Sequence, residues 1–165
     1  MAQAAESATA TPLSGVRLAG QGVLRFLGFE IYRARLWVQP GFDADNYGAQ
    51  PLALELTYHR DFTAEAIAKR SLEEMRRVGS FTPQQATRWQ QALQAALPDV
   101  KSGDRLLGIH QPGVGAVFKM AGRVVGEVPD AEFSRLFFGI WLSPQTSEPG
   151  LRQELLAATR TAGQP

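Results

Sequence analysis

Apolar and polar side chains alternate in two stretches of the first third of the chain, and this alternation predicts two half-buried strands. In residues 52–58, leucines and a final tyrosine alternate with smaller or polar residues. Residues 29–38 are rich in aromatic and aliphatic side chains and predict a longer strand, with Tyr32 on its inward face. The segment 39–50 between them is rich in Gly, Pro, Asp and Asn, which predicts a surface loop.

A helical period follows the second strand. Residues 63–78 predict a helix that Gly79 ends, and its apolar stripe consists of Ile67, Leu72, Met75 and Val78. The other positions of this helix carry charged side chains, among them Arg70 and Glu74. We expect these charged residues to face solvent.

Further elements are predicted in the second half of the chain. Thr82, Pro83 and Gln85 form a capping box with proline at the first helical position, which starts a second helix. Asp130 can cap a third helix, and a last helix is expected over residues 149–159. Between the second and third helices, short apolar runs separated by glycine-containing turns predict a three-stranded antiparallel meander over residues 104–111, 116–120 and 123–128.

The order of these elements predicts the fold class. Strands come first, then helices, then strands and helices again, which is typical of an α+β protein and not of alternating βαβ units. We therefore expect an antiparallel β-sheet with a helical layer packed on one face. Residues 15–165 are expected to form a single domain, without an internal repeat.

The small and polar residues 1–14 are expected to be a disordered leader or the remnant of an export-signal region. Ala2, Gln3 and Ala4 match the small-x-small pattern that precedes signal-peptide cleavage sites, although an alanine-rich tail also produces such triplets by chance. On this basis we expect a periplasmic protein, with the cytoplasm as the alternative.

Composition excludes several classes of function. The chain has 165 residues with 17 Lys+Arg and 16 Asp+Glu, and a net charge of +1 gives no basic stripe for nucleic acid. The absence of cysteine excludes disulfides, thiolate metal sites and a cysteine nucleophile. No stretch approaches the ~20 apolar residues of a membrane span. We expect no cofactor and no nucleic-acid partner, and the composition leaves the oligomeric state open.

A metal site is also not expected. The two histidines, His59 and His110, are too few for most histidine-built metal sites. His59 with Asp61 and Glu65 could form a small site, but a histidine at a strand end beside a helix start is more often a surface or capping residue.

One glycine pair superficially resembles a phosphate-binding motif. Gly20 and Gly22 begin a G-x-G-x-x-G pattern, but Arg25 occupies the position of the third glycine and no helical period follows directly. A dinucleotide-binding loop needs both features. We therefore set dinucleotide binding aside.

Arg25 and Tyr32 lie near the two ends of an apolar segment and are candidate binding residues. The strand alternation turns Tyr32 inward, where its hydroxyl needs a partner. Two interpretations stay open. Arg25 and Tyr32 can bind an anion, or Arg25 can pair with Glu30 while the backbone satisfies the tyrosine.

Arg33 and Arg35 share the other face of the same strand with Trp37. They could bind a carboxylate if that face lines a cavity, because arginine forms charge-assisted hydrogen bonds to such groups. We favour the alternative, in which this face is solvated.

Several blocks of the sequence resemble bacterial chalcone isomerase-like proteins. Residues 18–22 (LAGQG) and 26–38 (FLGFEIYRARLWV) are similar to the opening strands of that family. Matching blocks follow in the same order at residues 98–104, 133–144 and 149–152. The resemblance covers roughly residues 15–158 and, with several ordered blocks, is more specific than any one short motif.

This resemblance implies the chalcone isomerase fold, with a cleft between an antiparallel sheet and a helical layer. The fold hosts plant enzymes that close a chalcone into a flavanone and non-catalytic relatives that bind fatty acids. Both hold an anionic group with an arginine early in the chain, and the fatty-acid binders add a tyrosine. Tyr32 matches that tyrosine and Arg25 that arginine, while a shorter segment before Phe26 leaves Arg17 as a second candidate.

The same resemblance bears on catalysis. In the plant enzymes a tyrosine, a lysine and an asparagine surround the substrate, and our alignment places Phe62, Glu65 and Lys69 at those positions. Phenylalanine cannot donate a hydrogen bond, and a glutamate brings the wrong charge to a phenolate. Since aimed donors usually supply the largest catalytic contribution, chalcone cyclisation is not expected.

Three hypotheses about function follow. The first is a non-catalytic binding protein that holds a small amphipathic anion, such as a fatty acid, in an apolar cleft with Arg25 and Tyr32 at its head group. The second is an isomerase or intramolecular lyase on an unknown small substrate, with Tyr32 as proton donor and Arg25 as electrophile. The third is a structural or partner-binding protein with a filled core and no cavity.

Overall fold

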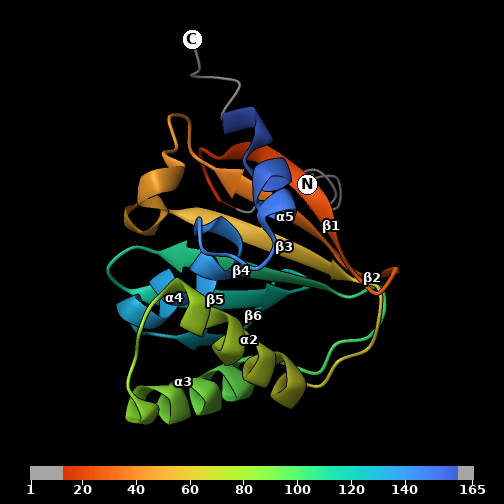
Figure 1. The fold of residues 1–165 in the computed structure, drawn as a ribbon, viewed down its shortest axis with the longest axis vertical. Helices are drawn as coiled ribbons and strands as arrows, with labels where there is room; N and C mark the ends of the chain where they lie inside the picture. Colours follow the sequence, from red (N-terminus) through yellow and green to blue (C-terminus); the bar gives the residue numbers. More distant parts are fainter. Residues whose placement is uncertain (1–12, 160–165) are drawn as a thin grey trace.

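Six strands form one antiparallel sheet in which each strand pairs with the next along the chain (Figure 1). The computed structural model describes residues 13–159, so most of the expected leader lies outside the described residues. The strands of this part are β1 (Arg17–Phe26), β2 (Phe29–Val38), β3 (Leu52–Tyr58), β4 (Arg105–Gln111), β5 (Gly115–Met120) and β6 (Arg123–Val128). The antiparallel sheet of the predicted α+β class is confirmed.

The alternation predicted for the first strands is present in the structure. Ala34 of β2 lies opposite Leu56 of β3, and Leu36 lies opposite Leu54. All four side chains are buried, and each buried leucine contributes about 1.5–3 kcal/mol of transfer free energy. In the same register, Tyr32 lies opposite Tyr58 at one end of the two strands.

Four helices cover this apolar face of the sheet (Figure 1). They are α2 (Ala64–Val78), α3 (Pro83–Ala96), α4 (Ala131–Leu142) and α5 (Pro149–Leu155). The predicted caps are confirmed, since Thr82 and Gln85 form both hydrogen bonds of a capping box and Asp130 accepts a bond from the Phe133 amide. Such caps stabilise a helix by about 1 kcal/mol each.

Glycines let three of these helices approach the sheet closely. A Cβ at Gly20 of β1 would overlap the backbone carbonyl of Glu154 in α5, and one at Gly126 of β6 would overlap Ala96 in α3. At Gly108 of β4 a Cβ would lie 3.3 Å from the Phe138 ring of α4. Close packing of helix backbone on sheet backbone therefore explains Gly20, which in the sequence belongs to the incomplete phosphate-binding pattern.

One predicted loop contains a helical turn. Within residues 39–50 the structure has a short 3-10 helix, η1 (Ala44–Ala49), whose first turn is capped by the Asp43 side chain. Tyr47 of this turn is buried, and its hydroxyl donates a 2.8 Å hydrogen bond to the Arg135 carbonyl. The polar composition of the segment predicted its surface position but not this anchoring contact.

The two arginines on the opposite face of β2 do not line a cavity. Arg35 lies 3.7 Å from Glu55 of β3 and places its guanidinium 5.3 Å from the Trp37 ring centroid, while Arg33 is exposed. Arg33 thus fits the solvated interpretation of this face, whereas Arg35 is half-buried and packs on Trp37 beside Glu55.

His110 of β4 is buried between η1 and α4. Its Nε2 lies 2.8 Å from the Gly48 carbonyl and its Nδ1 lies 2.6 Å from the Ser134 hydroxyl. A carbonyl only accepts, so Nε2 carries the proton and Nδ1 accepts from Ser134. Burial lowers the pKa of His110 below its ordinary value of 6.5, although the hydrogen bond to Gly48 partly opposes this shift.

Because of His110, we expect the protein to lose stability in mild acid. Because its pKa is lower in the folded than in the unfolded chain, its contribution is fully present above pH 6.5 and is lost as the pH falls below that value. Urea unfolding at pH values from about 7 to about 5 measures the effect. The variant His110→Gln should start less stable and lose less stability over the same range, and equal losses in both proteins would contradict the prediction.

Candidate functional site

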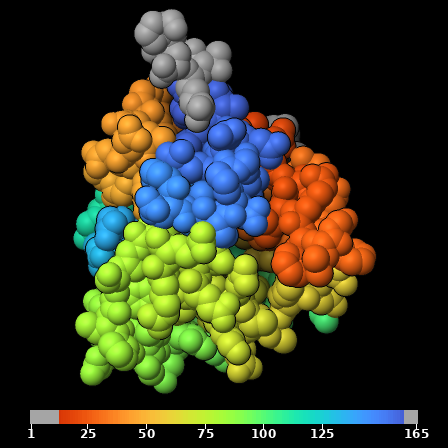
Figure 2. All heavy atoms as spheres, viewed as in Figure 1, coloured from red at the N-terminus to blue at the C-terminus, as the bar shows by residue number. Residues whose placement is uncertain are grey.

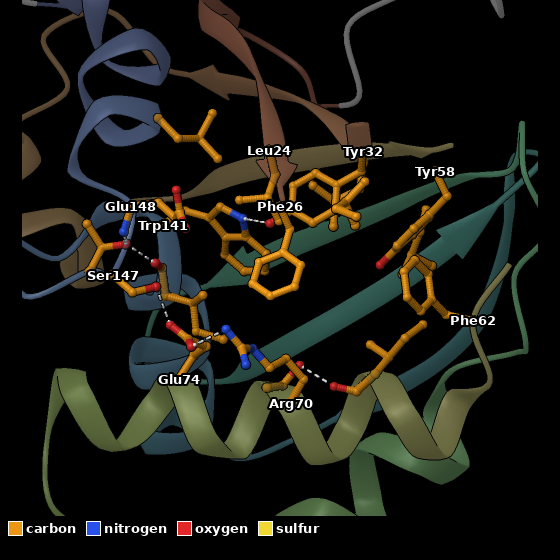
Figure 3. A pocket seen from close by; sticks show the side chains of 18 of the residues that line it. Leu24, Phe26, Tyr32, Tyr58, Phe62, Arg70, Glu74, Trp141, Ser147 and Glu148 are labelled. Carbon is orange, nitrogen blue, oxygen red and sulfur yellow. Dashed lines mark hydrogen bonds and ion pairs between the residues drawn. The ribbon is translucent and has the colours of Figure 1, made fainter. Parts of the chain in front are cut away.

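A cavity of about 300 Å³ lies between the sheet and helices α2, α4 and α5 (Figure 3). Small-molecule sites commonly span about 300–1,000 Å³ and have mostly apolar walls. Here the apolar walls consist of Leu24, Phe26, Ile31, Leu56, Phe62, Ile67, Leu97, Leu106, Phe137, Ile140 and Leu151. Figure 2 shows the same face from outside, where α2 in yellow-green, α5 in blue and the β1–β2 hairpin in orange meet.

The cavity exists because α2 packs mainly on α3 and α4 and not on the strands beneath it. Ile67, Arg70, Ser71 and Glu74 follow one another at helical spacing and line the cavity from α2. The expectation that these charged residues face solvent is wrong for Glu74 and holds for Arg70, which lies at the rim of the cavity. The Glu74 side chain is 15% exposed, whereas Arg70 reaches the rim and is 68% exposed.

Two tyrosine rings lie side by side in this cavity. Tyr32 and Tyr58 meet edge to face with ring centroids 5.8 Å apart. The Tyr32 hydroxyl accepts a 2.9 Å hydrogen bond from the Trp141 indole of α4, so a side chain and not the backbone satisfies it. Burial raises the pKa of both hydroxyls well above the ordinary tyrosine value, which keeps both phenols neutral.

Arg25 lines the same cavity at the end of β1. Its guanidinium lies 3.1 Å from the Glu30 carboxylate, and its side chain is 59% exposed. The structure therefore has the Arg25–Glu30 ion pair of the second interpretation, and this pair forms at the edge of the cavity that Tyr32 enters. Arg17, the other candidate arginine, lies at the opposite end of β1 and is not among the lining residues.

A chain of polar contacts joins α2 to the segment before α5. The guanidinium of Arg70 lies 3.0 Å from one Glu74 oxygen, and the other oxygen accepts a 2.6 Å hydrogen bond from the Ser147 hydroxyl (Figure 3). Glu148 also lines the cavity. The sequence did not predict these residues as part of a site. The only signal for those in α2 was that Arg70 and Glu74 share one helix face with Ile67.

The profile of a family described as chalcone isomerase-like matches residues 3–157. The chain belongs to the chalcone isomerase-like family. The resemblance inferred from the sequence blocks is confirmed by this match.

A solved structure with the same fold and a relative found by sequence illustrate the range of the similarity. A fatty-acid binding protein of Arabidopsis thaliana has a crystal structure that matches with a TM-score of 0.71 over 94% of each chain, at 13% identity. An uncharacterized protein of Haemophilus influenzae is 27% identical over 133 residues. That alignment covers 81% of this chain but only 64% of the Haemophilus protein, so the chain spans less than two thirds of that relative's length.

Of the three positions that the family resemblance aligned with catalytic residues, only Phe62 lines the cavity. Phe62 lines it and meets the Tyr58 ring edge to face at 5.8 Å. Glu65 and Lys69 are exposed on α2 and are not among the lining residues. The α2 side chains that do reach the cavity lie one or two positions further along the helix.

Two further findings concern the described residues alone. Within residues 13–159, no group of three or more histidine, aspartate or glutamate side chains could hold a metal ion. No helix of this part of the chain is long and apolar enough to cross a membrane.

Proposed function

We propose that this chalcone isomerase-like protein binds a small amphipathic anion, such as a fatty acid, in the cavity between sheet and helices. The observation that carries the proposal is a mostly apolar cavity that contains the Tyr32 hydroxyl and has Arg25 at its edge. Apolar walls fit a hydrocarbon chain, and a few convergent polar groups orient one end of it. The fold is shared with a protein that is described as fatty-acid binding, which supports the same ligand class.

Arg25 and Tyr32 have complementary roles in this proposal. The arginine supplies the charge for a carboxylate, which competes with Glu30 for the guanidinium. Tyr32 accepts from Trp141 and therefore still has its own proton to donate. The indole thus fixes the phenol in an orientation that suits a ligand oxygen.

The pKa of Tyr32 favours binding over the alternative of an isomerase that uses Tyr32 as proton donor. A general acid works best when its pKa lies near the working pH. Burial shifts the pKa of Tyr32 in the opposite direction, further from neutrality. The third hypothesis, a filled core, loses its support because the structure has the cavity.

Removal of the arginine tests the proposal. The variant Arg25→Ala should bind dodecanoic acid about tenfold more weakly, because a hydrogen bond to a charged group contributes about 1.5–3 kcal/mol and solvent weakens it at this exposed position. Isothermal titration calorimetry measures the change. Arg33→Ala is the matched control, since Arg33 lies on the uncovered face of the neighbouring strand. Equal affinities of the two variants would contradict the role of Arg25.

A further inference from the structure

Tyr58 presents a polar group to the cavity that the protein does not satisfy. The residue ends β3 and is only 4% exposed, and both of its ring neighbours, Tyr32 and Phe62, are aromatic. Its hydroxyl points into the cavity (Figure 3), and it has no hydrogen-bond partner within residues 13–159. A ligand that covers this hydroxyl without offering an acceptor leaves the donor unpaired, at a cost of roughly 1–3 kcal/mol, so a ligand that supplies the acceptor avoids this cost.

The surrounding side chains explain why the protein leaves this hydroxyl free. Tyr32 lies directly opposite in the sheet, with its hydroxyl engaged by the Trp141 indole. The other sheet side chains beside Tyr58, Leu56 and Leu106, have no polar atoms. The carboxylate of Glu74 is engaged by Arg70 and Ser147. Burial raises the pKa of Tyr58 and keeps it protonated, so it offers a donor and needs an acceptor.

The acceptor that Tyr58 needs is a different group from the carboxylate head group of the proposed ligand. The proposed carboxylate lies at Arg25, on the exposed end of β1, whereas Tyr58 belongs to β3. The strands β1 and β3 are separated by β2, and two strand spacings amount to roughly 10 Å. This separation is between the strand backbones, and the Tyr32 ring lies 5.8 Å from the Tyr58 ring. A carboxylate held by Arg25 and Tyr32 takes up the donors of these two residues, which leaves the Tyr58 hydroxyl to a second oxygen atom of the ligand.

We propose that the ligand is an oxygenated amphipathic acid, with a carbonyl or hydroxyl oxygen along its apolar part that accepts a hydrogen bond from Tyr58. This inference rests on the proposed function, because it takes the head group at Arg25 as given. Tyr58 is then a specificity-determining residue that distinguishes an oxo or hydroxy acid from the plain acid of equal length.

Two kinds of probe test the inference in the full chain. Calorimetry compares dodecanoic acid with a set of oxododecanoic acids that carry the ketone at successive chain positions. In the wild type, at least one oxo acid should bind about tenfold more tightly than dodecanoic acid, in line with one buried hydrogen bond. The variant Tyr58→Phe should lose this preference, so that the oxo acids and dodecanoic acid bind to it with similar affinity.

The matched control is Tyr47→Phe, because the Tyr47 hydroxyl is bonded to the Arg135 carbonyl and Tyr47 does not line the cavity. This variant should keep the preference for the oxo acid. The wild-type comparison of ligands does not depend on any variant, so it decides the question even if Tyr58→Phe folds poorly.

The outcomes separate this inference from the proposed function. If dodecanoic acid binds and Arg25→Ala weakens it, but no oxo acid binds more tightly, the inference is overturned and the proposed function stands. A preference that persists in Tyr58→Phe also overturns it. If neither kind of acid binds to the wild type, both the proposed function and the inference are overturned.

Discussion

Replacing Ser71 by tryptophan should reduce the binding of dodecanoic acid at least 100-fold, to the limit of detection, because the indole occupies the space that the ligand needs. Ser71 lines the cavity from α2 and is 8% exposed, with its hydroxyl bonded to the Ile67 carbonyl one turn earlier. A tryptophan side chain is large enough to fill much of a cavity of about 300 Å³. The ring enters empty space, so the cost in stability should stay within the roughly 1–3 kcal/mol of an overpacked site.

Calorimetry with dodecanoic acid and a thermal unfolding curve check this prediction together. The matched control is Lys69→Trp, which adds the same ring to the same helix at an exposed position outside the cavity. The control should bind like the wild type. If Ser71→Trp folds and binds like the control, the ligand does not occupy this cavity.

Replacing Gly20 by alanine should destabilise the protein by about 3 kcal/mol, because a Cβ at this position overlaps the backbone of α5. The atoms in its way are the carbonyl oxygens of Glu154 and Leu155, which cannot move without the helix. For a chain of this length, each kcal/mol lowers the unfolding midpoint by roughly 2–4 °C, so we expect a fall of about 10 °C.

Gly150→Ala is the control for this substitution. No atom lies within 4 Å of a Cβ at Gly150, so its unfolding midpoint should stay near that of the wild type. The Gly20 variant should also bind dodecanoic acid more weakly, since the displaced α5 supplies Leu151 to the cavity wall. Equal unfolding midpoints of the two variants would contradict the close packing of α5 on β1.

The strands and helices could be predicted from the sequence because their periods are local. The alternation in residues 29–38 and 52–58 and the capping box at Thr82 depend on neighbours within a few positions, and the structure has each of them. Close packing is not local. Position 20 needs a glycine because a helix more than one hundred residues later in the chain packs against it. The sequence around Gly20 shows only an incomplete glycine pattern.

The candidate site was predictable in part for the same reason. The inward orientation of Tyr32 follows from strand alternation, and the structure places it in the cavity with Arg25 at the edge. Arg70 and Glu74 were assigned to solvent because a polar side chain facing a cavity has the same helical spacing as one facing water. The bond from Trp141 to Tyr32 joins residues 109 positions apart and has no local sequence signal.

Native mass spectrometry can show whether an amphipathic acid occupies this cavity with its head group at Arg25. The freshly purified protein is measured before and after addition of a slight excess of dodecanoic acid. We expect a one-to-one complex in the wild type, a reduced fraction of complex in Arg25→Ala and no complex in Ser71→Trp. A wild type that stays free of ligand, or a complex that persists unchanged in Ser71→Trp, would contradict this expectation.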